Sequence, residues 1–87
     1  MAFRVHTVTN PALDASGRFT EQFTEFAKVK SAVVSGSDGY LPHIQNIANN
    51  VVTVECRGDL NSTTVSAFPA FGSGAITATF RILAEGI

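Results

Sequence analysis

The sequence predicts a small all-β protein: an antiparallel β-sandwich or partly open barrel of roughly six to seven strands. Three observations lead to this prediction. Valine, isoleucine and threonine account for 23 of the 87 residues, and their branched side chains suit a pleated sheet better than a helix. Turn-forming residues recur at short intervals. Between these breaks, polar and apolar residues alternate with the period of two that is typical of strands.

The first predicted strand runs from Phe3 to Thr9. Pro11 should end it, because proline has no N–H to donate to a ladder. Residues 1–12 are also a candidate N-terminal arm, since they precede the rest of the pattern. We therefore expect this segment either as a strand of the domain or as an arm that extends towards a partner.

The next segment has two interpretations. Phe19, Phe23 and Phe26 have the i, i+4, i+7 spacing of one helical face. The intervening threonines favour a strand instead. We expect an extended segment that can include a short helical turn near residues 20–27.

A strand and a hairpin follow. Val29 to Ser35 is an apolar run that ends at a glycine-rich loop. Tyr40 to Ile47 and Val51 to Arg57 are separated by Asn49-Asn50, and asparagine tolerates the left-handed geometry of a tight turn. The second hairpin strand has an inward face of Val52, Val54 and Cys56, with Thr53, Glu55 and Arg57 outward.

The C-terminal region contains a weaker and a stronger strand. Thr63 to Phe68 is the weaker one, and Pro69 ends it. Ala75 to Glu85 is the stronger one, because it alternates over eleven residues. Its apolar face is Ile76, Ala78, Phe80, Ile82 and Ala84, and Leu83 is the apolar exception on the opposite face.

Composition limits the domain organisation and the partners. Residues 1–87 are too few for a second core, so one β domain is expected. One cysteine cannot form an internal disulfide, and 15% charged residues with a net charge of −1 leave a weakly charged surface. The basic residues are scattered, which disfavours nucleic acid. No apolar run is long enough to cross a membrane, and no hydrophobic signal core begins the chain, so synthesis and use inside the cell are expected.

Candidate catalytic residues have simpler structural interpretations. Cys56 is a potential nucleophile, but its inward register favours a buried thiol. His6 and His43 lie on different strands without an acidic partner at a recognisable spacing. The carboxylates of Asp14, Glu21 and Glu25 have the pattern of a solvated face. We therefore expect no enzymatic activity, no cofactor and no metal site.

Several short motifs have equally simple interpretations. Arg57-Gly58-Asp59 matches an integrin-binding tripeptide, and Asn61-Ser62-Thr63 matches a glycosylation acceptor, but both suit turns or loops. Phe68 and Phe71 flank Pro69-Ala70 in an expected loop. Apolar side chains in a loop either cap the core or contact a partner.

The region from Val29 to Ile87 resembles small β proteins of tailed-bacteriophage virions. The resemblance is one of pattern, carried by Val29–Gly36, Gly39–Ile44, the asparagine turn before Val51–Val54, and the terminal strand Thr77–Ile87. Glu85 departs from it, because an apolar residue is expected there.

The resemblance implies a virion β-sandwich that decorates and strengthens a capsid (a cement protein), commonly as a homotrimer, without catalysis. The implied partners are further copies and the major capsid protein or a tail protein, and the location is the virion after synthesis in the host cytoplasm. The alternative is a small tail or fibre component, including a lectin-like receptor-binding module. The residues expected to make contacts are Phe3, Val5, Phe68 and Phe71.

The predicted outward faces carry threonine, serine and asparagine more often than lysine or glutamate. Charged residues normally protect strand edges and faces against pairing. This surface therefore predicts assembly, with a marginal monomer and a stability that depends on protein concentration.

Overall fold

The computed structural model describes residues 2–36, 40–56 and 74–87, and all regular elements within these ranges are β-strands. In chain order they are β1 (Ala2–Thr9), β2 (Ala12–Leu13), β3 (Arg18–Gln22), β4 (Val29–Ser35), β5 (Pro42–Ala48), β6 (Val51–Cys56), β7 (Gly74–Ala75) and β8 (Thr79–Gly86).

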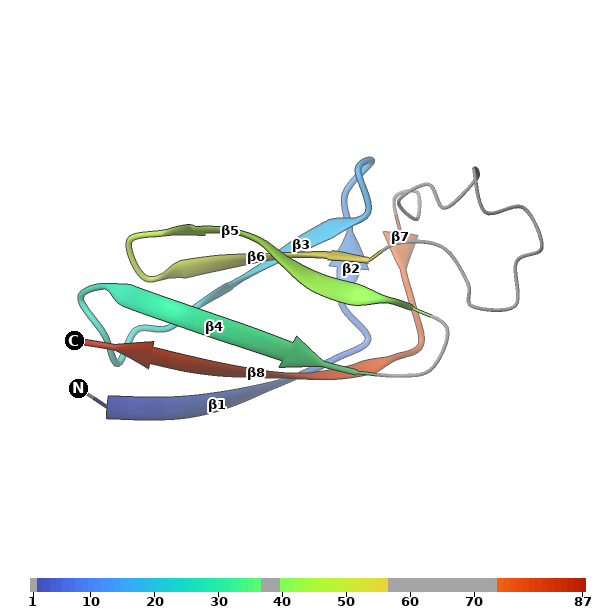
Figure 1. The fold of residues 1–87 in the computed structure, drawn as a ribbon. Helices are drawn as coiled ribbons and strands as arrows, with labels where there is room; N and C mark the ends of the chain where they lie inside the picture. Colours follow the sequence, from blue (N-terminus) through green and yellow to red (C-terminus); the bar gives the residue numbers. More distant parts are fainter. Residues whose placement is uncertain (1, 37–39, 57–73) are drawn as a thin grey trace.

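Six of these strands form two facing antiparallel sheets (Figure 1). The β8 sheet has the order β1-β8-β4, and the β6 sheet has the order β3-β6-β5. The short strands β2 and β7 pair with each other at one end of the sandwich. The predicted all-β sandwich is confirmed, and the two sheets do not close into a barrel.

The core lies between the two central strands, β6 and β8. Phe80, Ile82 and Ala84 of β8 are fully buried. Val52, Val54 and Cys56 of β6 are fully buried opposite them, as the alternation predicts. Because a central strand is covered on one face by the other sheet and flanked on both edges, its inward positions lose all contact with water.

The two phenylalanines that follow β3 complete this core. β3 ends at Gln22, and the Phe26 N–H donates to the Phe23 carbonyl across 3.1 Å in the turn that follows. Phe19, Phe23 and Phe26 are all buried. The extended segment is therefore confirmed over β3, and a single hydrogen-bonded turn, not a helix, follows it at Phe23–Phe26. A strand plus one turn places all three rings inside.

The hairpin predicted around Asn49-Asn50 joins β5 to β6. Ala48 pairs with Val51, and Asn49 has a φ of 54°. The sequence of this hairpin did not predict the bulge at Gln45. There the pairing of β5 with β6 shifts by one residue between Ile44 and Asn46. A second bulge at Lys30 shifts β4 against β8. An extra residue reverses which side chains face inward.

Two further expectations need correction. The stretch from Ala75 to Glu85 is not one strand, because the chain bends at residues 76–78 between β7 and β8. Asn10 holds this bend: its N–H donates to the Ala78 carbonyl, and its Oδ1 accepts from the Ala78 N–H at 3.0 Å. The N-terminal residues do not extend as an arm, since β1 pairs with β8 from Ala2 to Thr9.

Gly86 is expected to tolerate no side chain. A Cβ at this position would lie 2.5 Å from the Lys28 carbonyl oxygen and 2.7 Å from the Phe26 ring. Gly86→Ala should therefore lower the free energy of unfolding by about 1–3 kcal/mol, the usual cost of overpacking. Urea denaturation measures this change, and an unchanged midpoint would contradict the close backbone contact.

Candidate functional site

Exposed apolar side chains gather on the outer face of the β8 sheet. Phe3 is 60% exposed, Val5 56%, Val33 62% and Leu83 39%. The pairing places Val5 and Val33 on either side of Leu83, and it places Phe3 beside Glu85. We call this surface the β8 outer face, defined by Phe3, Val5, Val33, Arg81, Leu83 and Glu85.

The local sequence explains why these side chains point outward. In β1 the odd-numbered residues face away from the core, opposite Leu83 and its neighbours at i±2 in β8. In β4 the bulge at Lys30 resets the alternation, so Ala32 and Val34 turn inward and Val33 outward. The result is an apolar row across all three strands.

The structure describes two of the four residues that are expected to make contacts. Phe3 and Val5 are exposed on this face, whereas Phe68 and Phe71 lie outside the described residues. Val33 was not predicted, because its direction depends on the bulge. A hollow of about 220 Å³ on this face is lined by Phe3, Ser31, Ala32, Val33, Leu83 and Glu85.

A second cluster joins the edges of the two sheets. His6 lies on the inward side of β1, and its Nδ1 is 2.6 Å from Glu21 Oε2 on β3. Its Nε2 is 2.7 Å from Glu25 Oε2, in the connection between β3 and β4. The His6 ring stacks on Phe23 with a centroid distance of 3.8 Å. The sequence did not predict this cluster, because neither glutamate lies at a recognisable spacing from His6 along the chain.

This geometry favours a structural charge over catalysis. Partial burial lowers the pKa of His6, but hydrogen bonds and charge from Glu25 and Glu21 outweigh it and raise the pKa above 6.5. The hydrogen bond to His6 also lowers the pKa of Glu25 below 4.5. When both ring nitrogens donate to carboxylates, His6 has no lone pair left to accept a proton or bind a metal.

The His6 cluster predicts a pH-dependent stability. The raised pKa of His6 in the folded protein adds to the free energy of unfolding, and this contribution is complete below pH 6.5. It is lost as the pH rises through the raised folded-state pKa of His6. The lowered pKa of Glu25 acts in the opposite sense, and its contribution is lost as the pH falls below 4.5. The stability difference between wild type and His6→Gln should therefore be largest between these two values.

Chemical denaturation of both proteins from pH 3 to pH 9 measures this difference. Arg4, which also lies near Glu25, is present in both proteins. Parallel pH profiles for the two proteins would show that the cluster contributes nothing to folding.

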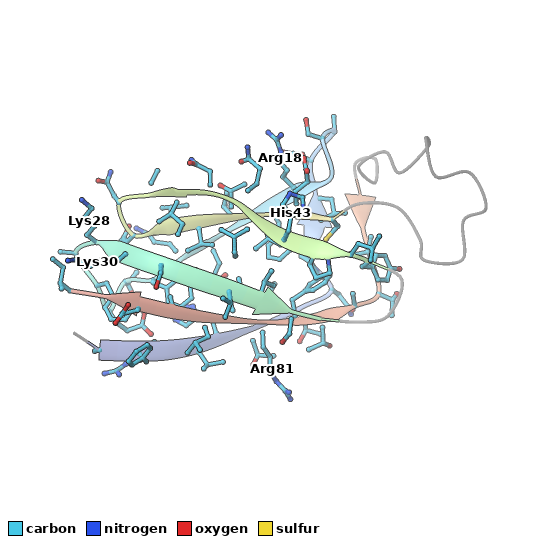
Figure 2. The ribbon with its side chains drawn as sticks, viewed as in Figure 1. Arg18, Lys28, Lys30, His43 and Arg81 are labelled. Carbon is cyan, nitrogen blue, oxygen red and sulfur yellow. The ribbon has the colours of Figure 1, made fainter. Side chains whose placement is uncertain are left out.

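A third cluster lies on the outer face of the β6 sheet. Glu55 pairs in register with Arg18 on β3 and with His43 on β5. Arg18 Nε donates to Glu55 Oε2 at 3.0 Å, and His43 Nε2 is 3.2 Å from Glu55 Oε1. Figure 2 shows Arg18 and His43 close together on this side of the sandwich. The alternation correctly turned Glu55 outward, but its flanking partners leave the residue 6% exposed.

Cys56 is buried, as expected. Burial, with the charge of Glu55, raises its pKa to about 11. Little thiolate exists at neutral pH under these conditions, and thiolate is the nucleophilic form. Asp14, another candidate, serves a turn: its Oδ1 accepts from the N–H groups of Ser16 and Arg18.

Residues 57–73, with the motifs at Arg57-Gly58-Asp59 and Asn61-Ser62-Thr63, lie outside the described residues. Among the described ones, no group of His, Cys, Asp or Glu is arranged to hold a metal ion. The same part of the chain contains no helix that is long and apolar enough to cross a membrane. Comparisons with protein-family models, curated proteins and solved structures found no match to this chain.

Proposed function

We propose that this chain is a non-enzymatic structural protein of a bacteriophage virion that decorates and stabilises the capsid as an oligomer. One observation carries the assembly part of this proposal: Val5, Leu83 and Val33 form an exposed apolar row across a whole sheet. An exposed apolar patch of this kind marks a contact surface. The virion context comes from the resemblance of residues 29–87 to small phage β proteins.

The other two clusters support the same function. The ion pairs of His6 and Glu55 connect strands within one sheet and between the two sheets. A protein that reinforces a shell needs rigid contact faces, and these charges contribute to rigidity.

Two experiments test the proposal. We expect the melting temperature to fall on hundredfold dilution, because association stabilises the folded chain by mass action. We also expect the gene to lie beside portal, major capsid or tail genes, and the protein to co-sediment with shells assembled from that major capsid protein. Leu83→Lys should weaken both effects, whereas Thr20→Lys, on the outer face of the β6 sheet, should leave them unchanged.

A concentration-independent melting temperature together with no co-sedimentation would remove the proposal. Binding to tail tubes or fibres instead of shells would move the protein from the head to the tail of the virion.

A further inference from the structure

Charge and apolar surface alternate in a symmetric way along the central strand of the β8 outer face. Arg81, Leu83 and Glu85 all point outward from β8, with the positive and negative residues two positions on either side of the leucine. The rows beside the leucine row are uncharged apart from these two residues: Thr7 and Ser35 flank Arg81, and Phe3 and Ser31 flank Glu85. Figure 2 shows Arg81 extending away from the sandwich on this side.

This order is self-complementary. A two-fold interface brings the same patch of both subunits together, so each residue must suit its symmetry mate. If a second copy lies face to face with its strands antiparallel, Leu83 contacts the partner's leucine and Arg81 faces the partner's glutamate at position 85. The parallel arrangement would oppose arginine to arginine and glutamate to glutamate. Two sheets normally pack with their strand directions closely aligned, as this contact requires.

We propose that the β8 outer face binds a second copy of this chain in a two-fold, antiparallel, face-to-face dimer centred on Leu83. Val5 and Val33 extend the leucine contact across the sheet, and two Arg81–Glu85 ion pairs close it at both ends. The inference rests on the proposed function, in which this face is covered in the assembly, and it names the occupant.

The two parts of the interface have different roles. The apolar row supplies the favourable free energy of association, because its burial removes exposed side chains from water. The ion pairs lie at the rim, where they contribute little affinity but select the orientation. No carboxylate in residues 2–36, 40–56 or 74–87 forms an ion pair with Arg81 inside one chain.

The size of the face predicts a weak dimer. Arg81 and Glu85 are about 13 Å apart along the strand, and the outer strands of the sheet are about 10 Å apart. A contact of this size is below the standard interface of about 800 Å² per partner. Self-association should therefore be sought at concentrations from about 10 μM to 1 mM, the range of weak complexes.

Charge exchange tests the arrangement. In the proposed dimer, position 81 of one copy faces position 85 of the other. Arg81→Glu therefore places a glutamate against a glutamate at both of these contacts, and Glu85→Arg places an arginine against an arginine. Each single variant should dimerise at least tenfold more weakly than wild type. The double variant Arg81→Glu/Glu85→Arg restores opposite charges and should return to within about threefold of wild type. Sedimentation equilibrium at low salt, where charge effects are least screened, measures all four proteins.

Two controls accompany this series. Thr20→Glu places a new charge on the β6 sheet and should leave the dissociation constant unchanged. Circular dichroism at low concentration checks that each variant is folded as a monomer. An equimolar mixture of the two single variants should form a heterodimer, since every facing pair then has opposite signs.

The outcomes separate this inference from the proposed function. Single variants that dimerise as well as wild type, or a double variant that fails to recover, would overturn the antiparallel arrangement. A trimer, as the resemblance to virion proteins implies, would overturn the two-fold symmetry while leaving the decoration function intact. If the protein binds shells but stays monomeric at 1 mM, the proposed dimer would likewise be overturned and the decoration function would remain.

Discussion

Phe80→Ala is expected to unfold most of the protein at 37 °C. Phe80 is fully buried in the central strand β8, where its ring contacts Phe19 and Tyr40 at centroid distances of 5.5 and 6.4 Å. Removing a buried phenylalanine typically costs about 3–5 kcal/mol. A domain of this size has a total stability of only about 5–10 kcal/mol, and the core cannot refill the space.

Collapse around the cavity is restricted by Gly36. A Cβ at this glycine would collide with the Phe80 ring, so the ring already lies directly against the backbone. Backbone moves less easily than a side chain, and the cavity should therefore persist. Thermal unfolding followed by circular dichroism measures the loss.

Phe3→Ala is the matched control, because it removes the same ring from an exposed position on the neighbouring strand β1. Its effect on the monomer should stay within about 0.5 kcal/mol. Equal losses from the two substitutions would contradict the placement of β8 at the centre of the sheet.

The central strands could be predicted from the sequence because the alternation of buried and exposed side chains follows from neighbouring residues alone. Each inward position of β6 and β8 meets the same environment, so Val52, Val54, Phe80 and Ile82 repeat with the period of the pleat. The Asn49-Asn50 turn was equally predictable, since the positive φ of Asn49 suits asparagine.

The edge strands were harder to predict because they contain the irregularities. The bulge at Lys30 determines that Val33 faces out, and no local pattern distinguishes Val33 from Val34 before the register is known. The break at residues 76–78 depends on Asn10, which comes from the other end of the chain.

The charged clusters were unpredictable for a related reason. His6 meets Glu21 because β1 and β3 are the neighbouring edges of different sheets, a contact that exists only after the sheets pack. Glu55 meets Arg18 and His43 because the register pairs them across β6. Sequence spacing contains neither piece of information.

The double variant Arg18→Met/His43→Leu is expected to lower the free energy of unfolding by about 1.5–3 kcal/mol at pH 7, the usual contribution of hydrogen bonds to a charged group. The Glu55 side chain is 8% exposed, and the variant removes two polar groups that contact its carboxylate while it keeps their aliphatic cover. Protonation removes the charge of the carboxyl group, so the stability loss relative to wild type should be smaller in acid than at pH 7.

Adding Glu55→Gln to this double variant separates charge from packing. The amide keeps the shape of the glutamate without its charge, so the triple variant should recover most of the lost stability at pH 7 and show little dependence on pH. Urea denaturation of the three proteins at pH 7 and pH 4 gives the comparison. If the double and triple variants are equally destabilised at both pH values, packing of Arg18 and His43 accounts for the loss. Recovery in the triple variant alone would assign the stability loss to the buried carboxylate of Glu55. The contacts of Glu55 with Arg18 and His43 would then favour the observed register of β3 and β5 on β6.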